Sequence, residues 1–156
     1  MSTGSDFLYL DYAATTPLDP QVIQRTQEVH TSAFGNAGSN HRAGWRSAAV
    51  VGRAAVQLGS LLKADPDCFL WTSGATESDN LAIAGAAKMR AHRGKHLVTM
   101  RTEHKAVVDM FQVLEKQGFE VSWLMPDANG RLSSENFEAA LRKDTQLASI
   151  MHINNE

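Results

Sequence analysis

The sequence lacks the features that mark secreted, membrane-spanning and nucleic-acid-binding proteins. Its single cysteine, Cys68, excludes an internal disulfide and a metal cluster built on several cysteines of one chain. No apolar run approaches the length that crosses a bilayer, and the first residues do not place a basic segment before an apolar one. The formal net charge of −2 gives no surplus of positive charge for nucleic acid or an anionic membrane. We therefore expect a cytoplasmic protein.

Segments typical of strands alternate with segments typical of helices over the 156 residues, a length that supports one domain and hardly two. We expect strands at residues 7–12, 68–72, 95–100, 120–124 and 145–151. We expect helices from Pro20 to about His30, from about His41 to Lys63, and from near Thr76, Glu103 and Ser133. Helices between most strands favour an α/β fold, with a mostly parallel sheet flanked by helices.

The same patterns predict which side chains are buried. The helix expected over 41–63 has an apolar stripe, which we assign to the core: Ala48, Val51, Ala55, Leu58 and Leu62. Cys68 opens a strand that we expect to be buried, where it serves as a small core side chain and not as a nucleophile. His30, His92 and His96 are expected at the surface or at strand edges, without metal-ligand spacing.

The stretch from Leu70 to Asn80 predicts a strand that turns sharply into a helix, with Gly74 permitting the bend. Such a corner presents unpaired backbone N–H groups and the positive end of a helix dipole, and Ser73 and Thr76 add hydroxyls. A phosphate fits these donors. An ordinary turn with a threonine N-cap explains the segment equally well, and the common nucleotide-binding fingerprints are absent.

Polar residues also follow two later strands, at 102–104 and at 152–156. Ligands of parallel sheets bind at the carboxyl ends of the strands, so these stretches and the 73–76 corner are the candidate site.

Six segments together resemble the cysteine desulfurases, which are pyridoxal-phosphate (PLP) enzymes of the class V aminotransferase group. The segments lie in the family's order and span nearly the whole chain: residues 9–17, 34–36, 41, 73–78, 103–107 and 152–156. The resemblance implies part of the large PLP-binding domain of fold type I enzymes. It divides the chain into an N-terminal segment, residues 1–16, and the N-terminal part of that domain, residues 17–156.

The resemblance also implies roles for single residues. Ala75, through its N–H, and Thr76, through its N–H and hydroxyl, would hold the cofactor phosphate. His104 would lie flat over the pyridine ring and exchange protons with the substrate, and Asn155 would donate to the phenolic oxygen and approach the substrate carboxylate. Without the resemblance, His104 fits a helix-start residue bonded to backbone, and Asn155 fits a strand-end turn.

The implied activity converts L-cysteine to L-alanine and an enzyme-bound persulfide, destined for iron–sulfur clusters or tRNA thiolation. The implied partners are a sulfur-acceptor or scaffold protein and, at full length, a second copy in a homodimer, with no direct contact to nucleic acid or membrane. The family's Schiff-base lysine and sulfur-accepting cysteine would lie beyond Glu156. We therefore expect the isolated chain to be inactive unless a second polypeptide completes it.

Two other interpretations remain open. One is a catalytically silent binding or interaction module on the same scaffold. The other is a different class V PLP enzyme, such as a selenocysteine lyase or an aminotransferase.

Overall fold

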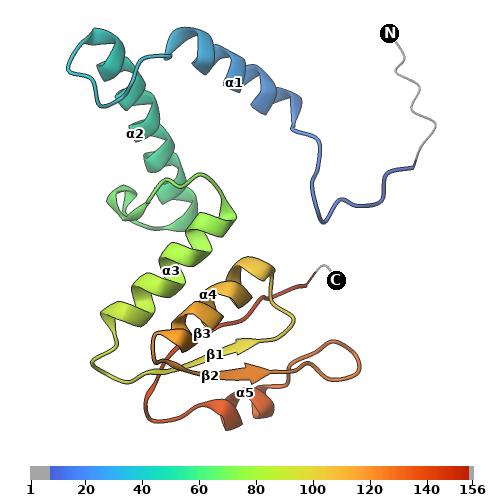
Figure 1. The fold of residues 1–156 in the computed structure, drawn as a ribbon. Helices are drawn as coiled ribbons and strands as arrows, with labels where there is room; N and C mark the ends of the chain where they lie inside the picture. Colours follow the sequence, from blue (N-terminus) through green and yellow to red (C-terminus); the bar gives the residue numbers. More distant parts are fainter. Residues whose placement is uncertain (1–7, 155–156) are drawn as a thin grey trace. The chain divides into compact units, whose positions relative to one another are not determined.

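The computed structural model describes residues 8–154. The chain forms two compact units, which divide after Trp71, and Figure 1 traces their elements along the chain. No helix in the described range is long and apolar enough to span a membrane.

The first unit contains two helices, α1 (Pro20–Ser32) and α2 (Arg42–Leu62), and the short 3-10 helix η1 (Pro66–Cys68). The helix starts follow from their caps. The Asp19 side chain accepts a hydrogen bond from the N–H of Gln21 at 2.7 Å, and His41 Nδ1 accepts one from the N–H of Gly44 at 3.3 Å. Both predicted helices are confirmed.

The loop between the two helices folds back onto the start of α2. A Cβ on Gly44 would lie only 2.2 Å from the Ser39 carbonyl oxygen, so this close approach requires glycine. Ser47 is buried and donates its hydroxyl to the Ala33 carbonyl at 2.8 Å.

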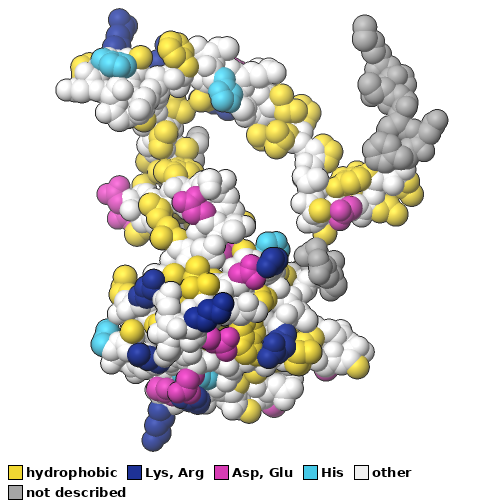
Figure 2. Space-filling view, in the orientation of Figure 1, with side chains coloured by type: hydrophobic (Ala, Val, Ile, Leu, Met, Phe, Trp, Pro, Cys, Tyr) yellow, Lys and Arg dark blue, Asp and Glu magenta, His cyan; other side chains and the backbone are white. Residues whose placement is uncertain are grey.

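The apolar stripe of α2 is not a core face, so that prediction is wrong. Val51 and Leu62 are 43% and 65% exposed, Ala48 is exposed, and Ala55 and Leu58 are half-buried. Figure 2 shows hydrophobic side chains at the surface over this helix. An apolar stripe is buried only against a second layer, and α2 buries only Gly44, Ser47 and Gly59 of its own residues.

Two predicted strands are absent from the described residues. Residues 8–12 have no strand pairing, and Leu8 and Leu10 are 81% and 78% exposed; Phe7 lies outside the described residues. Phe69 follows η1 in an extended conformation but pairs with no described strand. Cys68, expected in a core, is exposed at the end of η1. Extended segments become strands only where another strand accepts their backbone hydrogen bonds.

The second unit contains the sheet. Its elements are α3 (Ala75–Met89), β1 (His96–Met100), α4 (Lys105–Lys116), β2 (Glu120–Leu124), α5 (Ser134–Ala140) and β3 (Thr145–Ser149). The strand order is β2-β1-β3, with both pairings parallel. In Figure 1, α3 and α4 lie on one side of this sheet and α5 on the other, which confirms the predicted α/β fold.

The core of this unit forms between β1 and the helices α3 and α4. Leu97, Phe111 and Leu114 are fully buried, and Phe111 meets Trp123 edge-on with ring centroids 6.1 Å apart. The apolar face of α4 is therefore buried in this core. Gly118 follows the C-cap residue of α4 at a φ of 88°, the left-handed conformation that commonly ends a helix.

The amino end of the sheet is tightly packed. A Cβ on Gly94 would lie 2.2 Å from the Asp144 carbonyl oxygen. His96, expected at the surface or a strand edge, is only 1% exposed, because a central parallel strand is covered on both faces. Its Nδ1 lies 2.6 Å from Thr145 Oγ1 and its Nε2 lies 2.8 Å from Ser122 Oγ.

Candidate cofactor-binding site

The candidate site lies at the carboxyl end of the sheet. In Figure 1 the arrowheads of β1 and β2 point toward the end at which α3 and α4 begin. The segments that follow β1 and β3 reach the same end. The segments after β1 and β3 and the starts of α3 and α4 therefore lie toward the carboxyl end of the sheet.

The corner before α3 is held by Glu77. Its Oε2 accepts hydrogen bonds from the Ser73 N–H at 2.7 Å and from the Ser73 hydroxyl at 2.6 Å. The hydroxyl bond, and then the N–H bond, lower the pKa of the Glu77 carboxyl below its usual range. The Ser73 hydroxyl, expected as a free donor to an anion, is thus engaged within the chain.

The bend itself does not depend on Gly74. Its φ of 164° is extended backbone that any residue adopts, and a Cβ there would meet nothing within 4 Å. Gly74 is also the N-cap of α3 and supplies no side-chain hydrogen bond, so a threonine N-cap does not explain the corner. Thr72 instead contacts Ser78 through their hydroxyls at 2.6 Å, which ties the corner to the second turn of the helix.

The first turn of α3 leaves donors available. The N–H groups of Ala75, Thr76 and Glu77 have no carbonyl partner within a helix that begins at Ala75. No hydrogen bond among the described residues uses the Thr76 hydroxyl, which lines an open groove of about 750 Å³ together with Asn80 and Lys88. Amides, a hydroxyl and the positive end of a 15-residue helix form a donor set that fits a phosphate.

His104 begins α4. Its Nδ1 accepts a hydrogen bond from the Ala106 N–H at 3.2 Å, so Nδ1 carries no proton and the ring is fixed as an N-cap. This is the backbone-bonded arrangement that the sequence allowed. The imidazole is exposed, so capping leaves its faces accessible.

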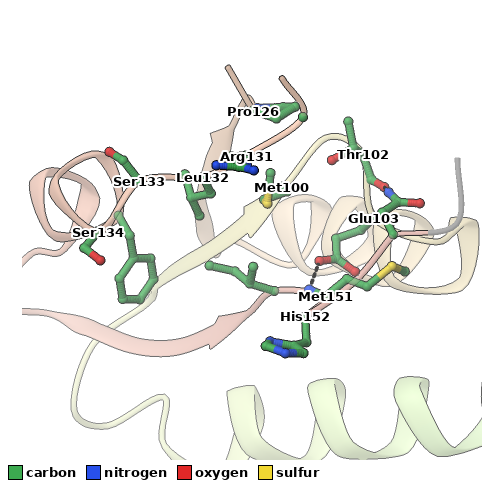
Figure 3. A pocket seen from close by; sticks show the side chains of 14 residues that line it. Met100, Thr102, Glu103, Pro126, Arg131, Leu132, Ser133, Ser134, Met151 and His152 are labelled. Carbon is green, nitrogen blue, oxygen red and sulfur yellow. Dashed lines mark hydrogen bonds between the residues drawn. The ribbon is translucent and has the colours of Figure 1, made fainter. Parts of the chain in front are cut away.

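Two side chains that lie in the predicted stretches 102–104 and 152–156, but were assigned no role there, join the segments after β1 and β3. Glu103 Oε1 accepts a hydrogen bond from the Met151 N–H, drawn as a dashed line in Figure 3. Asn154 Nδ2 donates to the Thr102 carbonyl at 2.6 Å. Both residues come three positions after the end of a predicted strand, and that position placed them in the candidate site without indicating these two contacts.

These segments border two hollows. One, of about 630 Å³, lies between Glu103, Arg131, Ser133 and His152 in Figure 3. His104 lines the other, of about 570 Å³, with Glu103 and Asn154.

The predicted site residues divide between separate hollows. Thr76 lines the groove beside α3 and His104 lines a groove beside α4, and no residue is common to both. Asn155 lies outside the described residues. The joint roles of Ala75, Thr76, His104 and Asn155 around one cofactor therefore stay a prediction.

Residues 8–156 match the family Aminotransferase class-V, and the chain belongs to this family. It is similar to the cysteine desulfurase IscS of Shewanella sediminis (strain HAW-EB3), with 51% identity over 152 residues. That alignment covers 96% of the chain, but the chain spans only about 38% of the length of this relative.

Two solved structures extend the comparison. DndA from Streptomyces lividans matches with a TM-score of 0.80 at 45% identity, over 96% of this chain and 42% of that one. SspA in complex with cysteine matches with a TM-score of 0.85 at 36% identity, over 95% of this chain and 43% of that one. The resemblance to the cysteine desulfurases is thereby confirmed.

Proposed function

We propose that this chain is the N-terminal part of a PLP-dependent cysteine desulfurase. The whole enzyme converts L-cysteine to L-alanine and an enzyme-bound persulfide, which supplies iron–sulfur cluster assembly or tRNA thiolation through a sulfur acceptor or scaffold protein. It acts in the cytoplasm as a homodimer, with residues 17–156 in its PLP-binding domain. The observation that carries the proposal is the uncapped first turn of α3 in a chain 51% identical to a cysteine desulfurase.

The cofactor phosphate is bound at that turn. The Ala75 and Thr76 N–H groups and the Thr76 hydroxyl donate to its oxygens, and the helix dipole stabilises its charge. Glu77 keeps Ser73 against the helix, which holds the turn in place. PLP, when bound, supplies an electron sink for the carbanion chemistry of amino acids.

His104 covers the pyridine ring. Its Nδ1 is held by the Ala106 N–H, which leaves Nε2 to carry and exchange the proton. The cap fixes the plane of the imidazole before the cofactor binds, so little ordering is needed on binding. Asn155 would donate to the phenolic oxygen of PLP, as the family resemblance implies.

The activity is tested with a chimera of residues 1–156 and the remaining, aligned part of the Shewanella sediminis relative. We expect PLP binding and release of alanine from L-cysteine, with a persulfide on the enzyme, whereas the isolated chain releases none. A chimera that binds PLP without releasing alanine identifies a silent scaffold. Preference for selenocysteine over cysteine identifies the other class V enzyme, and either result contradicts the proposal.

The phosphate site is tested by Thr76→Val in the same chimera. A hydrogen bond to a charged group contributes about 1.5–3 kcal/mol, so PLP binding should weaken about ten- to a hundredfold. Thr31→Val is the matched control, because the Thr31 hydroxyl bonds only to carbonyls of its own helix α1. Equal PLP affinity in the two variants would remove Thr76 from the site.

A further inference from the structure

The amino end of the sheet, opposite the candidate site, contains a buried titratable group that the proposed function does not use. We propose that His96 is a pH-sensitive clamp: its neutral ring joins β1 to β2 and to β3, and its protonation releases the start of β3. This inference does not depend on the proposed function.

The hydrogen-bond partners of the ring suit a neutral imidazole. Thr145 Oγ1 accepts a hydrogen bond from the Arg142 N–H at 2.7 Å, and the Thr145 hydrogen can point to His96 Nδ1 at 2.6 Å. The clamp takes Nδ1 as the acceptor. Nε2 carries the proton and donates to Ser122 Oγ at 2.8 Å. One neutral tautomer satisfies both neighbouring strands.

The clamp lies where the backbone pairing of β3 is irregular. His96 pairs with Thr145, but Leu97 pairs with Leu147, so the register shifts between these two positions. Gln146 is the extra residue, and its Nε2 donates to the Ala87 carbonyl at 3.1 Å. At this interruption of the ladder, the side-chain bond from His96 to Thr145 adds to the backbone bond from the His96 N–H to the Asp144 carbonyl at 3.4 Å.

The charged groups around the ring do not favour an imidazolium. Glu120 faces it from β2, and Arg142 and Asp144 face it from the turn before β3. The Arg142 guanidinium already binds Glu120 at 2.6 Å and Asp144 at 2.9 Å, so both carboxylates are paired. Burial of the ring and then the Arg142 charge lower the pKa of His96, against a smaller opposite effect of the two carboxylates.

Protonation would turn both ring nitrogens into donors. Nδ1–H would then donate to Thr145 Oγ1 beside the Arg142 N–H, the Thr145 hydrogen would lose its acceptor, and the ring, which is 1% exposed, would hold a buried charge. Because the pKa in the folded chain lies below the ordinary value of about 6.5, the unfolded chain binds more protons as the pH falls below that value. The stabilisation is complete above about pH 6.5 and is lost as the pH falls through the lowered pKa.

The released strand leads to the candidate site. β3 continues into Met151, which binds Glu103, and into Asn154, which binds Thr102. The release concerns the start of β3, because Leu147–Ser149 stay paired with β1 and the Thr99 hydroxyl donates to the Ser149 carbonyl at 2.9 Å.

The tautomer is tested on the full chain by ¹⁵N NMR of the His96 ring. At about pH 8, where an ordinary histidine is neutral, we expect a protonated Nε2 and an unprotonated Nδ1. On acidification, protonation of Nδ1 should coincide with loss of the Thr145 backbone amide signal from its folded position. The opposite tautomer, or protonation that leaves Thr145 unchanged, overturns the proposal.

The effect on stability is tested by His96→Gln, a side chain that does not titrate. Unfolding is followed by Trp123 fluorescence in chains carrying Trp45→Phe and Trp71→Phe, with His92→Gln as the matched control because His92 is exposed near the same end of β1. Between about pH 8 and about pH 5, the folding constant should fall on the order of tenfold for each unit by which the His96 pKa is lowered.

His92→Gln should retain this fall of the folding constant with decreasing pH, and His96→Gln should abolish it. An equal pH dependence in His96→Gln and His92→Gln would show that His96 is not the sensor. If His96→Gln does not fold, ¹⁵N NMR of the His96 ring in the unmodified chain still tests the proposal.

Discussion

The two compact units contain helices of similar amphipathic pattern, but only one of them builds a core. In the unit after Trp71, α4 buries Phe111 and Leu114 completely, over a sheet whose central strand is fully covered. In the unit up to Trp71, α1 buries none of its residues and α2 buries only small ones. An apolar stripe therefore predicts a helix and its apolar face, whereas burial of that face needs a second layer within reach.

The sharpest way to break this comparison is to truncate one apolar side chain in each unit. Phe111→Ala should destabilise the second unit by about 3–5 kcal/mol, because it leaves a cavity between α4 and β1. Leu62→Ala, at a position 65% exposed, should change stability by less than about 0.5 kcal/mol. Urea unfolding followed by circular dichroism measures both. Similar losses of stability in the two variants would show that Leu62 packs in a core, which its exposure contradicts.

A second comparison uses one glycine from each unit. Gly94→Ala should cost about 1–3 kcal/mol, because its Cβ would lie 2.2 Å from the Asp144 carbonyl oxygen. Gly52→Ala should stabilise by about 0.5–1 kcal/mol, because Gly52 is inside α2 with nothing within 4 Å of its Cβ position. Thermal unfolding should give shifts of opposite sign, and shifts of the same sign would contradict the packing at Gly94.

Each unit also has a helix capped by a histidine Nδ1, at His41 and at His104. His104→Ala should cost about 1 kcal/mol, and His104→Asn should restore most of this loss, since asparagine also caps helices. If His104 covers PLP, both His104→Ala and His104→Asn should weaken PLP binding by the chimera. His41→Asn should leave PLP binding unchanged. Normal PLP binding by His104→Asn would reduce His104 to a capping residue.

The smallest expected effects come from exposed ion pairs on the helices of both units. Lys105 and Asp109 are 2.7 Å apart on α4, and Arg25 and Glu28 are 2.9 Å apart on α1. Lys105→Met and Glu28→Gln should each lower the free energy of unfolding by about 0.2–0.5 kcal/mol, and this loss should shrink in high salt. A cost above about 1 kcal/mol, measured by urea unfolding, would indicate a buried or networked charge.

Local signals were sufficient to predict most of the second unit. Ser133 caps α5 by accepting from the Asn136 N–H, and β2 has the predicted bounds, Glu120–Leu124. The start of α1 was equally predictable, because the Asp19 side chain and Pro20 act within one turn. In each case the determining contact lies within a few residues of the element.

Non-local features could not be predicted in this way. The stretch around Phe69 has strand-forming residues, but a strand also needs a partner that the local sequence does not specify. The role of Glu77 was missed because its bond to Ser73 depends on the path of the corner. His96 had a usable signal, since it begins a run of five consecutive residues that are all buried in a parallel strand.

The exposure of Cys68 has a practical consequence for these measurements. It is the only thiol in the sequence and it lies at the surface at the end of η1. A maleimide dye or spin label will therefore attach at one known position, without mutagenesis to remove competing sites. The same thiol will join two molecules through an intermolecular disulfide if samples are stored without a reductant.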